Sequence, residues 1–197
     1  MFFVRDWMSA PVLTIPPRIP APVALEFMRK HHVRRLPVVE AKTLVGIVTK
    51  SDLEAVFGKD KTSRTSDKRT VEDVMTPGPF TVSPDDTFEG AALLMLRQRI
   101  SGLPVVKADQ VVGILTESDI FRALAAMMGI AEHGPRITMH IGEQEDLLEG
   151  VRKRIGQLRI RSMVTLYNPR AKRWDVAVRV RGRVAEREEK PGKAAKV

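Results

Sequence analysis

The stretch VGIVTKSD at residues 45–52 returns as VGILTESD at residues 112–119. Outward from this signature the similarity continues at the same offset, so that residues 4–57 align with residues 71–124 without a gap. A repeat of this length is the sequence mark of a structural unit that occurs twice. We therefore expect two copies of one fold, called the first and second copy below, with the function lying between them.

Each copy reads as a β-α-β-β-α unit. In the second copy a short β-like segment at residues 80–82 leads into a polar turn, where Asp86 or Thr87 can cap a helix. Apolar residues of helical period follow, and then two segments rich in branched residues that are separated by a hairpin turn at residues 107–110. A second helix completes the unit. The first copy carries prolines before its first helix, which we expect to begin near Pro22.

The remaining third of the chain has a different pattern, β-α-β-β, and a different charge. It carries 16 Lys and Arg against 8 Asp and Glu, whereas residues 1–133 carry 17 against 16. The net charge of +9 therefore comes almost wholly from this third. The expected fold class is mixed α/β (α+β), and the expected segments are 1–57 and 71–133 for the two copies, 58–70 for a linker, 134–186 for a basic domain and 187–197 for a disordered tail.

Several classes of function are disfavoured by composition. No apolar run is long enough to span a membrane, and the chain has no cysteine, so we expect a cytoplasmic protein without disulfides or thiolate metal sites. No Gly-x-Ser-x-Gly, Walker-type or His-Glu-x-x-His pattern occurs, and the four histidines lack a metal-ligand spacing. We expect no enzymatic activity, no metal and no tightly bound cofactor.

The repeated signature, Gly-x-x-Thr-x-Ser-Asp, lies where a strand passes into a helix. Free N–H groups and the helix dipole favour an anion at such a junction. Thr49 and Thr116 offer hydroxyls to a phosphate, and Asp52 and Asp119 can accept hydrogen bonds from two ribose hydroxyls. The same residue types are equally typical of a helix N-terminal cap. A nucleotide site and a structural cap both remain open at this point.

Immediately before the Leu-Pro-Val-Val segment, only the first copy carries arginines. Arg34 and Arg35 can meet the phosphates of a ligand, whereas Ser101 and Gly102 at the equivalent positions carry no charge. The alternative is that these arginines form a solvated helix end, which is favourable to the helix dipole.

The two copies resemble a tandem of CBS domains (cystathionine β-synthase type), often called a Bateman module, over about residues 4–124. The resemblance rests on three motifs in each copy: Asp-x-Met, hydrophobic-Pro-Val-Val and Gly-x-x-Thr-x-Ser-Asp. It implies copies packed about a pseudo-twofold axis, clefts that bind AMP, ADP, ATP or S-adenosylmethionine as an effector ligand, and a homodimer. One occupied cleft and two occupied clefts both remain open.

The same resemblance assigns roles to individual residues. It places Thr49 and Thr116 at the phosphate of the ligand, and Asp52 and Asp119 at its ribose. The residues that would line the base are Thr14, Thr81, Pro37 and Pro104.

The basic domain more weakly resembles part of an ACT-type regulatory domain, by element order alone. Arg179, Arg181 and Arg183 share one face of its last strand, opposite Trp174 and alternate valines. They can be the solvent-exposed face of a sheet that is buried on one side only. Alternatively, they form an electropositive stripe that binds nucleic acid or an acidic protein. Two functions therefore stay open: a sensor of an adenosine-containing ligand, and a scaffold in which the copies only dimerise and residues 134–186 bind the partner.

Overall fold

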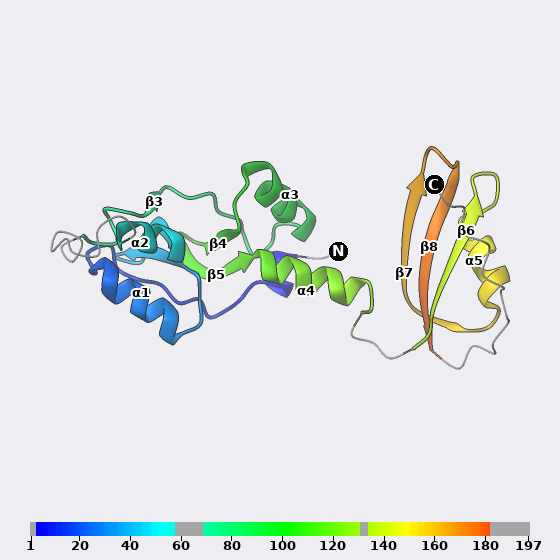
Figure 1. Cartoon of the computed structure of the whole chain (residues 1–197), viewed down its shortest axis with the longest axis horizontal. Helices are drawn as coiled ribbons and strands as arrows, with labels where there is room; N and C mark the ends of the chain where they lie inside the picture. Colours follow the sequence, from blue (N-terminus) through cyan, green and yellow to red (C-terminus); the bar gives the residue numbers. More distant parts are fainter. Residues whose placement is uncertain (1–2, 58–68, 131–133, 182–197) are drawn as a thin grey trace. The chain divides into compact units, whose positions relative to one another are not determined.

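The fold is taken from a computed structural model that describes residues 3–57, 69–130 and 134–181 (Figure 1). The chain divides into two compact units, residues 1–122 and 123–197, and each is considered by itself. Most of the expected linker and all of the expected tail lie outside the described residues. The domain limits derived from the sequence therefore stay predictions.

The two copies have the expected order of elements, with one difference. The first strand of each copy is reduced to a single parallel bridge, Ile15 with Val38 and Val82 with Val105. Nearby prolines explain this, because a proline has no N–H to donate to a ladder. The elements are η1 (Val4–Asp6), α1 (Ala21–Lys30), β1 (Arg35–Glu40), β2 (Thr43–Thr49), α2 (Lys50–Phe57), β3 (Thr76–Pro77), α3 (Phe88–Gln98), β4 (Gly102–Lys107), β5 (Gln110–Thr116) and α4 (Glu117–Met127).

Local sequence accounts for the caps and turns. Helix α1 begins at Ala21, with prolines at its start and no side-chain cap, as the sequence predicts. Helix α3 is capped by Thr87, whose hydroxyl accepts a hydrogen bond from the first turn at 3.2 Å. The hairpin between β4 and β5 turns through Ala108 and Asp109, both with positive φ, which is the two-residue turn that matches strand twist.

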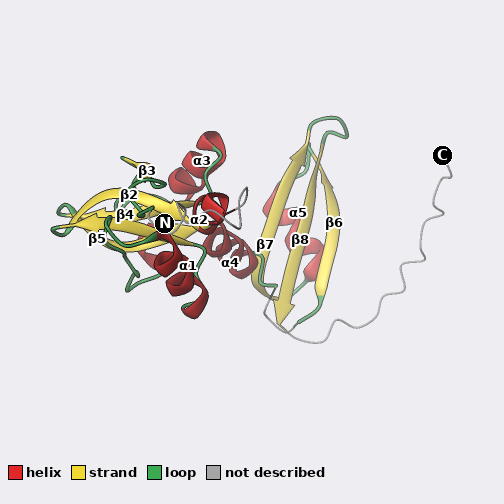
Figure 2. Cartoon of the chain, turned by 60° about the vertical axis from the view of Figure 1, so that its left-hand side comes forward, coloured by secondary structure: helices red, strands yellow, loops and turns green. Residues whose placement is uncertain are grey.

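Each copy completes its sheet with a segment of the other copy. Strand β3 belongs to the second copy in sequence, yet it pairs antiparallel with Gly46 and Ile47 of β2. In return Ser9 of the first copy bridges Ile114 of β5, through hydrogen bonds of 2.9 and 3.1 Å. Helices flank these strands (Figure 2). This exchange joins the two copies into one unit.

Hydrogen bonds at equivalent positions show the pseudo-twofold relation. The Val4 N–H donates to the Asp86 carbonyl at 3.0 Å, and the Val71 N–H donates to the Ile19 carbonyl at 2.9 Å. Each copy therefore begins by binding the turn that precedes the first helix of the other copy. Such reciprocity is what two copies packed about a twofold axis require.

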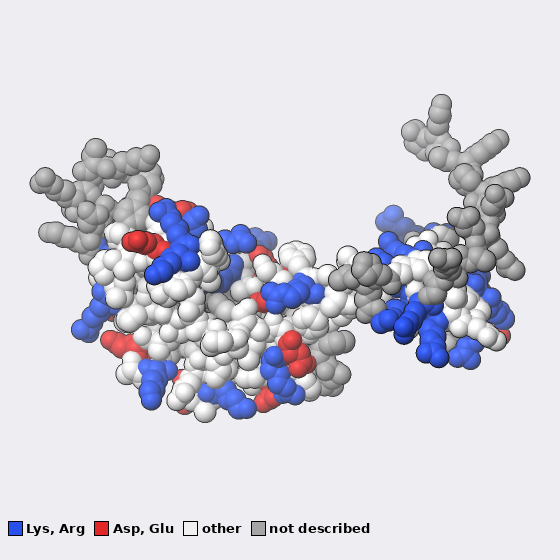
Figure 3. Space-filling view, turned by 90° about the horizontal axis from the view of Figure 1, so that it is seen from below, with Lys and Arg blue, Asp and Glu red and all other residues white. Residues whose placement is uncertain are grey.

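The C-terminal unit has the expected β-α-β-β order, with β6 (Arg136–Gly142), α5 (Leu147–Ile155), β7 (Arg159–Asn168) and β8 (Arg173–Arg181). Its sheet has the order β6-β8-β7, so the last strand is central. Helix α5 packs on one face, over a core that includes Ile141, Val151 and Val178. In the view of Figure 3 Lys and Arg gather on this unit, whereas both signs of charge mix over the CBS-like copies.

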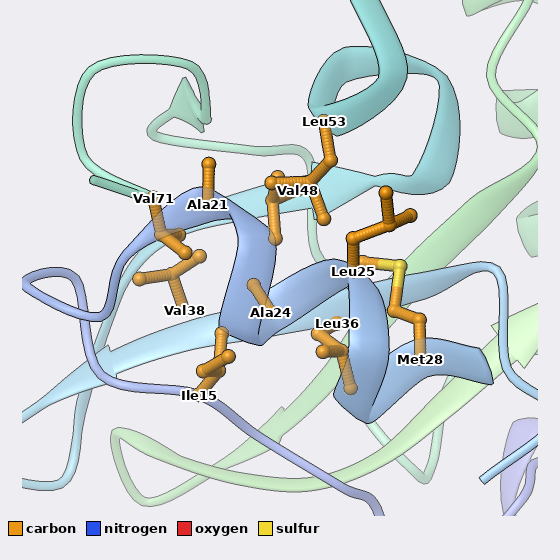
Figure 4. Close-up of a cluster of buried hydrophobic side chains, with 10 residues drawn as sticks. All are labelled: Ile15, Ala21, Ala24, Leu25, Met28, Leu36, Val38, Val48, Leu53 and Val71. Carbon is orange, nitrogen blue, oxygen red and sulfur yellow. The ribbon is translucent and has the colours of Figure 1, made fainter. Parts of the chain in front are cut away.

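The core of the first copy is built from apolar side chains of α1, α2, β1 and β2, together with Ile15 and Val71 (Figure 4). Val71 is the first residue of the second copy, and it is fully buried. Burying a valine side chain contributes about 1.5–3 kcal/mol. The exchange is therefore stabilised by apolar burial as well as by backbone hydrogen bonds.

Candidate ligand clefts

Both signatures end in the same capped junction between strand and helix. The Oδ2 atom of Asp52 accepts hydrogen bonds from the backbone N–H and the hydroxyl of Thr49, at 2.8 and 2.7 Å. The Oδ2 atom of Asp119 accepts the same two bonds from Thr116, at 2.8 and 2.7 Å. The capping interpretation of the signature is thus confirmed in both copies. Because each threonine hydroxyl donates to its own aspartate, it must turn before it can donate to a phosphate.

The other carboxylate oxygen distinguishes the two copies. The Oδ1 atom of Asp119 pairs with the Arg122 guanidinium at 3.0 Å, and the Asp119 side chain is only 1% exposed. Ser9 adds a long contact of 3.5 Å to the same oxygen. The first copy has Ala55 at the position equivalent to Arg122, and Asp52 is partly exposed. Among the described residues, Asp52 therefore offers the more accessible acceptor.

Neighbouring strands bring the other expected residues of the first copy to the same region. The Ile15 N–H donates to the Pro37 carbonyl at 3.1 Å, which places Thr14 beside β1. Thr49 in turn pairs with Arg35 across β1 and β2. Thr14 is exposed and Pro37 is buried, so only the threonine presents a free surface to a base.

The second copy repeats this arrangement. The Val82 N–H donates to the Pro104 carbonyl at 3.2 Å, which places Thr81 beside β4. Thr81 is exposed and Pro104 is buried, as in the first copy. The ligand contacts expected of the threonines and prolines stay predictions.

The side chain of Arg35 reaches the second copy. A side chain added at Gly102 would collide with the Arg35 guanidinium, so this arginine lies over β4 of the second copy. Burial lowers the pKa of Arg35, while the negative charges of Glu117 and Asp119 act in the opposite direction. The charge of Arg35 therefore lies beside the second copy's signature, and the ligand contact expected of Arg35 stays a prediction.

Arg34 stays with the first copy. Its carbonyl accepts a hydrogen bond of 2.8 Å from the N–H of Lys50, the first residue of α2, and its side chain is exposed. Both interpretations of Arg34, a phosphate contact and a solvated cation, remain open.

The signature glycines have a structural role that sequence reasoning missed. A Cβ at Gly46 would meet the Met75 side chain and the Thr76 carbonyl, and a Cβ at Gly113 would meet Met8. The group that approaches each strand at this glycine is the methionine of the other copy's Asp-x-Met motif. The repeated methionine at a constant offset was the signal that could have revealed this contact.

The described residues contain no group of three or more His, Cys, Asp or Glu placed to hold a metal ion. None of their helices is long and apolar enough to cross a membrane.

Comparison with known proteins decides the family. The family model of the CBS domain matches the chain twice, at residues 4–58 and 71–126. The chain belongs to the CBS domain family. Its CBS pair is 36% identical over 121 residues to an inosine-5'-monophosphate dehydrogenase of Korarchaeum cryptofilum. That match covers 61% of this chain and only 23% of the dehydrogenase.

Solved structures of CBS pairs are similar to this one. The CBS domain pair of protein MJ0100, in complex with 5'-methylthioadenosine and S-adenosyl-L-methionine, has a TM-score of 0.58 and 32% identity. It matches 64% of this chain and 98% of its own. CBSX2 of Arabidopsis thaliana, in complex with AMP, has a TM-score of 0.57, 32% identity and the same coverage.

Proposed function

We propose that this CBS pair is a non-catalytic regulatory module that binds an adenosine-containing ligand, AMP, ADP, ATP or S-adenosylmethionine, and signals through the C-terminal unit. The observation that carries the proposal is the capped Thr-x-x-Asp junction, which occurs in both copies with one carboxylate still accessible. The complexes of similar CBS pairs with AMP and with S-adenosylmethionine support an adenosine compound as the ligand.

The difference between the two aspartates predicts clefts of unequal affinity. A ribose can bond to Asp52 without breaking an ion pair, whereas at the buried Asp119 carboxylate it must compete with the exposed Arg122 guanidinium. Leaving a charged group unpaired in a buried site is costly. The Asp52 cleft is therefore the stronger ribose site in this proposal. The Asp119 cleft is the weaker one, and Arg35 and Arg122 give it positive charge for a phosphate.

Calorimetry with variants of the capping aspartates tests the proposal. Asp52→Asn keeps an oxygen for the cap but removes the charge that receives the ribose hydroxyls, so we expect AMP affinity to fall by about tenfold or more, in line with the ~1.5–3 kcal/mol of a charged hydrogen bond. Asp119→Asn should affect only a second, weaker binding step. Asp146→Asn is the matched control, because Asp146 caps α5 in the C-terminal unit through the Glu149 N–H at 2.8 Å.

The outcomes separate the alternatives clearly. If none of the four ligands gives heat at millimolar concentration, the ligand-sensing function is wrong. Equal losses for Asp52→Asn and Asp146→Asn would show that the effect comes from stability and not from ligand contact. A ligand acts as a switch only when it binds two conformations unequally, by ~1–3 kcal/mol in typical allosteric coupling.

A further inference from the structure

The sheet of the C-terminal unit has one face that α5 does not cover. On β8 the residues Val176, Val178 and Val180 are buried under the helix. Side chains alternate along a strand, so Arg179 and Arg181 point to the opposite face, which we call the open face. This confirms the expected alternation for these two arginines, while Arg183 lies outside the described residues.

The strand register places four arginines at one end of the open face. Arg179 is the register partner of Arg136 on β6, and Arg181 is the register partner of Arg159 on β7. This group is called the arginine end. Like charges directly opposite each other on neighbouring strands destabilise a sheet. An anion bound across the arginine end would relieve that repulsion.

The acidic residues within 134–181 pair away from the arginine end. Among the residues that the structure describes, each acidic side chain has another role. Their partners are Tyr167 for Glu143, Arg154 for Glu145, the α5 N-terminus for Asp146, Lys153 for Glu149, and Arg173 with His140 for Asp175. Within the described part of the unit, Arg179 makes a long bond of 3.5 Å to the Gly134 carbonyl and packs against Gly129, and neither group carries a negative charge. In the view of Figure 3, Lys and Arg outnumber Asp and Glu on the visible surface of the C-terminal unit.

We propose that the arginine end binds the phosphate backbone of double-stranded nucleic acid, without reading its sequence. Arginine suits this partner because its planar guanidinium forms paired hydrogen bonds with phosphate. The net charge of the last third, 16 basic against 8 acidic residues, would attract a polyanion over a distance. This inference is independent of the ligand clefts.

The aromatic residues favour a duplex over a single strand. Proteins that bind single strands stack bases on exposed aromatic rings. In the C-terminal unit Tyr167 and Trp174 are register partners on the α5 side of the sheet, with ring centroids 5.1 Å apart. Within residues 134–181 the open face therefore carries arginines and no Phe, Tyr or Trp ring. That composition fits contacts to a backbone and not to bases.

The test measures binding of the full chain to a labelled DNA duplex and RNA duplex by fluorescence anisotropy. Four phosphate contacts predict that affinity falls about 100-fold between ~50 and ~200 mM salt, because each contact contributes about −0.9 to the logarithmic salt slope. The double variant Arg136→Gln with Arg179→Gln should weaken binding by about tenfold or more and make the slope shallower by about 2. The same variant should not lose stability, because it removes an opposed pair of like charges.

The matched control removes the same charge elsewhere. Arg152 is exposed on α5 and Arg170 is exposed in the turn between β7 and β8. Replacing both with glutamine should leave the affinity and the salt slope nearly unchanged. No binding to either duplex at ~50 mM salt, or equal losses in the two double variants, would overturn the proposal. So would tighter binding to single strands, or binding to phosphatidylserine vesicles but not to a duplex.

Discussion

At the scale of single residues, the two copies differ where they face each other. Arg35 and Gly102 occupy equivalent positions in the two copies, and the arginine side chain lies over the glycine. Two arginines could not share this space. In the sequence alone, arginine against glycine at this position looks like a random change on the surface. In the structure, one of the two residues must be small and uncharged so that the other can be an arginine.

An exchange of these two residues tests that packing. Gly102→Arg should destabilise the chain by about 1–3 kcal/mol, because it overfills the space under Arg35 and adds a like charge. Adding Arg35→Gly to the same chain should restore most of the lost stability. The new arginine at position 102 can then lie over the new glycine at position 35, which reverses the arrangement of the natural pair. Urea unfolding of the two single variants and the double variant measures the coupling, which is typically 0.5–3 kcal/mol for residues in contact. Additive effects would show that the two positions do not face each other in solution.

At the scale of elements, the Asp-x-Met segment of each copy packs on the sheet of the other copy and holds the two copies together. Met75 fills the space above Gly46, and Met8 fills the space above Gly113. Beside them, β3 adds to the sheet of the first copy and the Ser9 bridge adds to that of the second. The glycine of each signature therefore leaves room for the methionine of the other copy.

Substitution of the signature glycines should weaken this pairing. Gly46→Ala and Gly113→Ala each place a Cβ against a methionine side chain and a backbone carbonyl, so we expect a loss of about 1–3 kcal/mol in the free energy of unfolding. Gly142→Ala is the control, because a Cβ at that strand position meets nothing within 4 Å. Chemical denaturation followed by circular dichroism gives the comparison. If Gly142→Ala lowers the free energy of unfolding as much as Gly46→Ala does, the contact between glycine and methionine does not stabilise the pair of copies.

At the scale of the whole molecule, the CBS pair exposes large apolar side chains on two of its helices. Leu93 and Leu96 of α3 are 43% and 75% exposed, and Phe121 of α4 is 69% exposed. Exposed apolar residues gathered on helices often mark an interface. We propose that they contribute to the homodimer that the family resemblance implies.

Charge placed on these helices should then break the dimer. Leu96→Glu and Phe121→Glu leave the buried core unchanged, so each chain should still fold, but the elution volume should shift to that of a monomer. Light scattering coupled to size exclusion measures the mass directly. The control is Leu166→Glu, an equally exposed leucine at 68% in the C-terminal unit, which should leave the mass unchanged. A wild-type chain that is already monomeric would refute the proposed interface.

The sequence by itself determined the duplication, the order of elements and the alternation of β8, because these depend on local periodicity and on comparison between the copies. It left two candidates for the cap of α3, and the structure selects Thr87. Only the tertiary structure decided which copy Arg35 serves, what fills the space above Gly46, and how far Asp119 is buried. The physical reason is that these features are contacts between copies. An alignment shows which positions are equivalent, but the distances between them depend on how the two sheets exchange their edge segments.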